Sequence, residues 1–74
     1  MKRKAKILKY TAIFEPAEEG GYVVTIPALP GCVTQGETFE EAKAMAKDAI
    51  QGYIAVLRED KEPIPIEASL NKPA

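Results

Sequence analysis

The chain has 74 residues, of which 46% are hydrophobic and 28% charged, and its formal net charge is −1. This composition is typical of a folded domain and too hydrophobic for a disordered chain. A domain of this size buries only about 60% of the surface that its unfolded chain exposes, so its core is marginal. With one cysteine and no histidine, the sequence excludes an intrachain disulfide and a Cys/His zinc site. We therefore predict no metal or other cofactor, and a homodimer or higher homo-oligomer as the remaining source of stability.

The N-terminus is basic, and the rest of the chain is acidic. Five of the ten basic residues come before Tyr10, and all eleven acidic residues follow it. A basic arm over residues 1–6 can neutralise phosphates, which makes its four cationic side chains the candidate nucleic-acid-binding residues: Lys2, Arg3, Lys4 and Lys6. Because no aromatic residue for base stacking occurs before Tyr10, a solvated arm or a row of lysines on a strand edge is the preferred interpretation. No apolar stretch of signal-peptide or membrane-spanning length follows, so we predict a cytoplasmic protein with no membrane partner.

Alternating apolar and polar side chains predict three strands in the first half of the chain. Residues 7–15 alternate as in a half-buried strand, and residues 16–21 contain the proline and the glycines of a turn. Residues 22–26 are aromatic and β-branched, which favours a central strand. Prolines and Gly31 then shape a tight connection to a third strand at residues 32–35. The expected arrangement is an antiparallel three-stranded meander.

A long helix is predicted to follow the meander. Thr38 and Glu41 have the spacing of a capping box, in which the threonine hydroxyl accepts from the Glu41 amide and the glutamate carboxylate reaches back to the Thr38 amide. The helix can continue to about Asp60, with Gly52 as its weak point. Its apolar arc is wider than a surface helix normally needs, so the extra flank is the candidate oligomer or partner surface: Met45, Ala49, Gly52 and Val56.

A short fourth strand is predicted after the helix, at residues 66–70, because the sequence alternates again beyond two prolines. A right-handed crossover would place it beside the 7–15 strand, in the spatial order 3-2-1-4. The predicted fold class is therefore α+β with the element order β-β-β-α-β. We expect a single domain over residues 7–70 and a C-terminal tail over residues 71–74.

The sequence shows no group of residues with the types and spacings of a known catalytic site. Without histidine, Ser-His and Cys-His nucleophile pairs are excluded, and Cys32 has no adjacent basic residue to lower its pKa. Glu40, Glu41 and Asp48 are the densest carboxylates on the expected helix, but they do not converge on one point. The glycines match no nucleotide-binding pattern. We therefore predict a binding protein, with no catalytic residues and no metal ligands.

Residues 21–42 resemble the signature of HicB-type antitoxins. The run combines a tyrosine-containing strand, a Leu-Pro-Gly-Cys turn, a Thr-Gln-Gly step and a Thr-x-Glu-Glu-Ala helix start. With a later motif near residue 60, the resemblance covers residues 10–65, or 56 of the 74 residues. Ala28 departs from the family pattern, which often has an acidic residue there. The family motif of turn and helix cap comprises Leu29, Pro30, Gly31, Cys32, Thr38 and Glu41.

The resemblance implies a partial ribonuclease-H-like fold and a partner toxin, HicA, a small basic ribonuclease that cleaves mRNA. The implied function is that of the antitoxin of a type II toxin-antitoxin pair, which inhibits a HicA-like toxin by occluding its active site. Many family members carry a C-terminal DNA-binding domain, for which this sequence shows no counterpart, so direct DNA binding is not expected. The residues alone leave two alternatives open, a small nucleic-acid-binding module that uses the basic arm and an orphan protein-interaction domain.

Overall fold

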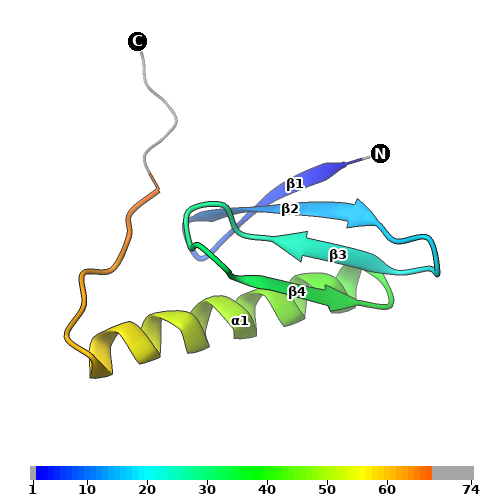
Figure 1. The fold of residues 1–74 in the computed structure, drawn as a ribbon. Helices are drawn as coiled ribbons and strands as arrows, with labels where there is room; N and C mark the ends of the chain where they lie inside the picture. The colour runs from blue at the N-terminus through cyan, green and yellow to red at the C-terminus, as the bar shows by residue number, and fades with distance from the viewer. Residues whose placement is uncertain (1, 68–74) are drawn as a thin grey trace, which may run out of the picture.

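The computed structural model of the protein describes residues 2–67. Within this range four strands form one antiparallel sheet in the order β1-β2-β3-β4, and a helix packs against one side of it (Figure 1). The elements are β1 (Arg3–Ile7), β2 (Tyr10–Pro16), β3 (Tyr22–Thr25), β4 (Val33–Gly36) and α1 (Phe39–Glu59). The predicted α+β class is confirmed, and so are the meander, as β2 to β4, and the long helix that follows it.

The first hairpin corrects the prediction of one strand over residues 7–15. The chain turns at Leu8 and Lys9, so that β1 pairs with β2 from Ile7 opposite Tyr10 onward. Both turn residues have positive φ, 51° and 74°, which is the backbone of a two-residue hairpin turn. Such turns normally use glycine, asparagine or aspartate, and none occurs here. The basic N-terminal residues are therefore strand residues, which agrees with the strand-edge interpretation.

The predicted position of the last strand is also wrong. β1 occupies the sheet edge beside β2 where residues 66–70 were expected. Ile66 and Glu67 are not in a strand, and residues 68–70 lie outside the described residues. The described element order is thus β-β-β-β-α. Closing a two-residue turn costs far less chain entropy than closing the long connection through α1, so the local strand takes the edge.

The core lies between the sheet and α1. Alternate residues of β2 and the middle of β3 are fully buried, among them Phe14 and Val24. The Phe14 ring packs against the Phe39 ring at the start of the helix, with 4.7 Å between their centroids. The buried residues of the helix are small or branched, so its axis can lie close to the sheet: Ala42, Ala46 and Ile50.

Gly36 determines how closely the first turn of α1 approaches the sheet. A Cβ added at Gly36 would lie 2.5 Å from the nitrogen and 2.6 Å from the Cα of Ala42. These are backbone atoms of the helix, so no change of side-chain rotamer can relieve the contact. The glycine that ends β4 is therefore required by packing against the helix, which the sequence pattern by itself does not reveal.

Candidate interaction surface

The helix flank predicted as an interaction surface is largely exposed. Met45 and Val56 are 41% and 56% exposed, and a Cβ added at Gly52 would meet nothing within 4 Å. Ala49 differs, because it is half-buried and packs against the core. The flank therefore presents two large apolar side chains to solvent, separated by residues small enough for another surface to approach closely.

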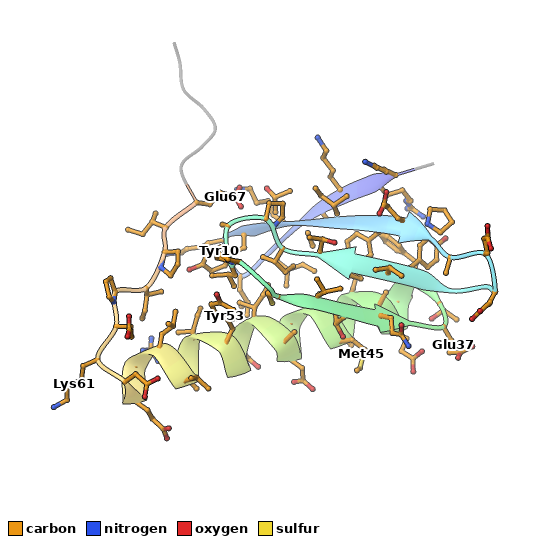
Figure 2. The ribbon with its side chains drawn as sticks, in the orientation of Figure 1. Tyr10, Glu37, Met45, Tyr53, Lys61 and Glu67 are labelled. Carbon is orange, nitrogen blue, oxygen red and sulfur yellow. The ribbon has the colours of Figure 1, made fainter. Side chains whose placement is uncertain are left out.

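This flank runs along the same side of the molecule as β4. Met45 lines a hollow of about 370 Å³ together with Gln35 and Gly36 at the end of β4, and Figure 2 shows its side chain below that strand. One helical turn beyond Ala49, the Tyr53 hydroxyl donates to the Pro30 carbonyl at 2.7 Å, just before β4 begins. The outer strand and the apolar flank thus form one continuous strip along the molecule.

Acidic side chains gather around the same hollow. Glu19, Glu37 and Glu41 line it, and none of its lining residues is basic. They come from the β2–β3 turn, the β4–α1 connection and the first turn of α1. The sequence pattern singles out Glu41 as a cap and as one of the helix carboxylates but does not group it with Glu19 and Glu37, because only the fold brings these three segments together. Within residues 2–67, no group of three or more Cys, Asp or Glu residues is placed to hold a metal ion.

The turn residues of the family motif, residues 29–32, mainly stabilise the fold and contribute little to an exposed surface. Leu29 and Cys32 are buried, and their amides donate to the carbonyls of Ile26 and Leu29. Gly31 has a φ of 81°, which favours glycine. Burial raises the pKa of the Cys32 thiol, so the thiolate that would act as a nucleophile is disfavoured. Pro30 is exposed and supplies the carbonyl that Tyr53 binds.

The helix cap is confirmed in one half and corrected in the other. The Thr38 hydroxyl accepts from the Glu41 amide at 3.0 Å, as predicted. The Glu41 carboxylate accepts from the amide of Glu37 and not from that of Thr38. The carboxylate therefore ties the end of β4 to the helix start, one residue earlier than a capping box requires.

Most of the candidate nucleic-acid residues have partners within the protein. The Arg3 guanidinium lies over the Phe39 ring, 3.8 Å from its centroid. This is a cation–π contact, in which the ring's electrons attract the positive charge. Lys2 pairs with Glu15 at 3.5 Å, and Lys6 pairs with Glu67 at 2.9 Å. Lys4 lies on the same strand and is exposed. The structure therefore does not assemble these four residues into a free basic arm.

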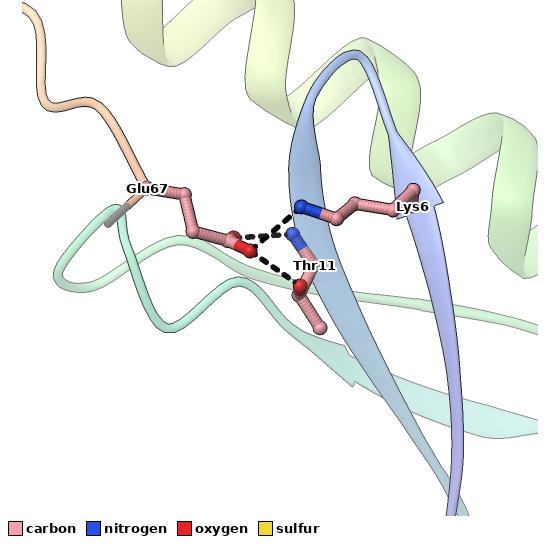
Figure 3. Close-up of polar contacts among 3 residues, drawn as sticks. All are labelled: Lys6, Thr11 and Glu67. Atoms are coloured by element: carbon pink, nitrogen blue, oxygen red, sulfur yellow. Dashed lines mark hydrogen bonds and ion pairs between the residues drawn. The ribbon is translucent and has the colours of Figure 1, made fainter. Parts of the chain in front are cut away.

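A polar cluster at the C-terminal end of the described chain escaped sequence reasoning. The Glu67 carboxylate accepts from the Thr11 amide, from the Thr11 hydroxyl at 2.6 Å and from Lys6 Nζ at 2.9 Å (Figure 3). Beside it, the Tyr10 hydroxyl donates to the Pro65 carbonyl. We call these contacts the Glu67 clip, which fastens the segment after α1 to the first hairpin. The sequence gives no sign of this cluster, because Pro65 and Glu67 lie more than fifty positions from the residues that they contact.

The Glu67 clip should make stability depend on pH. The hydrogen bond from the Thr11 side chain, followed by the Thr11 amide and Lys6, lowers the pKa of Glu67 from 4.5 to about 2. Because the folded-state pKa is depressed, the clip stabilises the fold above the unfolded pKa and is lost as pH falls toward 2. Glu67→Gln should reduce the free energy of unfolding by about 1–2 kcal/mol at pH 7 and by almost nothing near pH 2.

Urea unfolding at the two pH values measures this effect. Glu62→Gln, an exposed carboxylate in the same segment, serves as the control and should change stability at neither pH. An equal loss at both pH values for Glu67→Gln would show that the carboxylate charge is not what stabilises the clip.

The fold and its surface define a small α+β domain with an apolar helix flank beside an uncharged outer strand. A family model described as HicB_like antitoxin of bacterial toxin-antitoxin system matches residues 10–74. The chain belongs to this HicB-like antitoxin family, which confirms the resemblance seen in residues 21–42. The structure also has no helix, within the residues it describes, that is long and apolar enough to cross a membrane.

Relatives of two kinds are similar to the chain. A UPF0150 protein of Thermoplasma acidophilum is 52% identical over 58 residues, which cover 78% of this chain and 84% of that protein. Antitoxin HicB 1 of Photorhabdus laumondii is 46% identical over 82% of this chain, and Antitoxin HicB of Escherichia coli K12 is 42% identical over 86% of it. The matched regions span only 39% and 46% of those two antitoxins.

Proposed function

We propose that this protein is the antitoxin of a type II toxin-antitoxin pair and inhibits a HicA-like, mRNA-cleaving toxin by occluding its active site. The observation that carries the proposal is the match to the HicB-like family over residues 10–74, supported by two relatives named Antitoxin HicB. The matched range includes β2, β3, β4 and α1. The matched region is under half of each of those antitoxins. The proposal therefore assigns to this domain the inhibition of the toxin and no other activity of the longer proteins.

The chemistry of the chain supports a role in binding. It contains no histidine, and its cysteine is buried with a raised thiol pKa. All eleven acidic residues follow Tyr10, and three of them line the hollow beside β4. A basic ribonuclease would be attracted to such a body, because complementary charge speeds encounter and suppresses wrong partners. We therefore propose a stoichiometric inhibitor that is not an enzyme.

The nucleic-acid-binding alternative is less well supported. Arg3 is stacked on Phe39, and Lys2 and Lys6 are paired with carboxylates. Removing residues 1–6 would delete most of β1, so a deletion cannot separate the arm from the fold. The orphan interaction domain differs from the first proposal only in lacking a toxin, and the same experiment distinguishes the two.

Three further properties belong to this proposal. We propose a homo-oligomer, since a small domain with an exposed apolar flank gains stability by association. The cytoplasm is the compartment in which an inhibitor of mRNA cleavage would act. The partial ribonuclease-H-like architecture implied by the family remains a prediction, and direct DNA binding forms no part of the function proposed here.

Co-expression tests the proposed function. A HicA-like toxin gene next to the gene for this protein should arrest growth when induced alone, and growth should recover when this protein is produced with it. The two proteins should co-purify, and their complex should weaken as salt is raised from 0.05 to 0.5 M, because the Debye length falls from about 14 to about 4 Å and charge attraction is screened. The Phe14→Ala variant, whose core is damaged, is the control and should not rescue growth. A neighbouring toxin that kills equally with and without this protein would reject the antitoxin proposal.

A further inference from the structure

A groove of about 490 Å³ lies at the end of the molecule where the first hairpin turns. Three segments form its walls: the β1–β2 turn, the C-terminal half of α1, and the segment after α1, which the Glu67 clip holds beside that hairpin (Figure 1). Mostly apolar hollows of this volume are typical of small-molecule sites. We call it the hairpin groove, and its apolar and aromatic lining consists of Leu8, Tyr10, Ile54, Ile64 and Ile66.

The charged side chains of the hairpin groove leave it positive. Lys9 and Arg58 line it, and within residues 2–67 neither has an ion-pair partner. Glu67, the carboxylate in the lining, is paired with Lys6 and accepts hydrogen bonds from Thr11. Its side chain is only 11% exposed. The groove therefore offers apolar contact together with two cations, a combination that suits an anion with an apolar chain.

The hairpin turn brings side chains to this groove at a cost in backbone energy. Leu8 and Lys9 have φ of 51° and 74°, a conformation that crowds their Cβ atoms and that Asn-Gly adopts more readily. Both side chains line the groove, and Leu8 stays 43% exposed. Asparagine and glycine would supply neither the apolar surface nor the cation. Strained backbone of this kind clusters at ligand-binding sites.

The toxin proposed above does not fit the hairpin groove. A basic ribonuclease would be repelled by Lys9 and Arg58. The match to the HicB-like family begins at Tyr10, so the two turn residues lie outside the matched range. Eight residues line the groove, whereas a stable protein–protein interface uses about 20–30 residues a side. These observations favour a small anionic molecule over a protein as the occupant.

We infer that the hairpin groove binds a small amphipathic carboxylate. The apolar chain of the ligand lies against the side chains of the turn and of the segment after α1, among them Leu8 and Ile66. Its carboxylate pairs with Lys9 and Arg58, the two cations that have no partner within residues 2–67. The Glu67 clip holds one wall in place, so the site is formed before the ligand arrives.

Titration of the full chain with octanoate tests the inference. Heteronuclear NMR should show saturable shifts centred on the groove, with a Kd of about 1 mM, an ordinary affinity for a ligand of this size. Octylammonium has the same chain with the opposite charge, and acetate has the charge without the chain. Each should bind at least about tenfold more weakly. Equal binding of octanoate and octylammonium, or saturable shifts centred on another surface, would overturn the assignment.

A double variant of the turn separates binding from folding. Leu8→Asn combined with Lys9→Gly should raise the midpoint of thermal unfolding, because these residues accept the left-handed turn. The same variant should bind octanoate at least about tenfold more weakly, since one apolar side chain and one cation are lost. A more stable variant that binds octanoate as well as the wild type would contradict the inference.

Two further pairs of variants test the other walls. Arg58→Gln should weaken octanoate binding about fivefold, whereas Lys47→Gln, exposed on α1 and outside the lining, should leave it unchanged. Ile66→Ser should weaken binding about threefold through lost apolar contact. Ile66 is 87% exposed, so its loss does not damage the core, and Val33→Ser on β4 is its control. Unchanged affinity in both Arg58→Gln and Ile66→Ser would rule out this site.

The inference does not depend on the proposed function, and the experiments keep the two apart. Octanoate binding requires no toxin, and rescue of growth requires no occupied groove. A protein that rescues growth but does not bind octanoate would overturn the groove ligand and leave the antitoxin proposal standing. A protein that binds octanoate at the groove but neutralises no toxin would reject only the antitoxin proposal.

Discussion

Replacing Phe14 by alanine is expected to lower the free energy of unfolding by about 3–5 kcal/mol. Phe14 is fully buried in the middle of the core, and its ring packs 4.7 Å from that of Phe39. Truncation would leave a cavity between β2 and the start of α1. A domain of this length has a total stability of roughly 4–11 kcal/mol at 0.05–0.15 kcal/mol per residue, so the variant should lose a large part of its stability and unfold at a clearly lower temperature than the wild type.

Ile13 offers the matched control for Phe14. It is the preceding residue of β2 and lies on the face of the sheet away from the helix, where it is half-buried. Ile13→Ala should cost only about 1 kcal/mol, because less apolar area leaves water at this position. Thermal unfolding followed by circular dichroism compares the two variants. Similar losses for both would mean that the core does not lie on the helix side of the sheet.

Replacing Gly36 by alanine is expected to cost about 3 kcal/mol, although a single methyl group is added. The new Cβ would lie 2.5 Å from the Ala42 nitrogen, so the first turn of α1 would have to move away from β4. That movement would strain the hydrogen bonds by which Glu41 and Thr38 hold the helix start. The free energy from urea unfolding measures the loss.

Gly52 provides the opposite outcome for the same substitution. It lies in the middle of α1, and a Cβ there would meet nothing within 4 Å. Gly52→Ala should stabilise the protein by about 0.5–1 kcal/mol, since alanine favours the helix and restricts the unfolded chain. If Gly36→Ala were as harmless as Gly52→Ala, the close approach of α1 to β4 would be ruled out.

Elements with strong local signals could be predicted from the sequence. The Thr38 cap, the strand at residues 22–26 and the helix that ends near Asp60 all depend on neighbours within a few positions, and the structure reproduces them within one or two residues. The first hairpin could not be predicted in this way. Its turn residues, Leu8 and Lys9, lack the glycine, asparagine or aspartate that normally marks a left-handed turn.

The candidate surface was predicted in part. The helical period placed Met45 and Val56 on one exposed flank, because positions three, four and seven apart lie on the same side of a helix. The period could not show that Ala49 is drawn into the core or that β4 lies alongside. Both depend on where the helix axis settles over the sheet, which Gly36 and the buried alanines decide.

By itself, the sequence determined the family, the α+β class, the long capped helix and the lack of histidine-based chemistry. These follow from composition and from patterns that extend over a few residues. Only the tertiary structure decided that the basic N-terminus is an edge strand, that Glu67 fastens the chain to Thr11 and that the apolar flank adjoins an uncharged strand. Such features join residues far apart in sequence, and their pairing is decided by competition among whole-chain arrangements that no local pattern records.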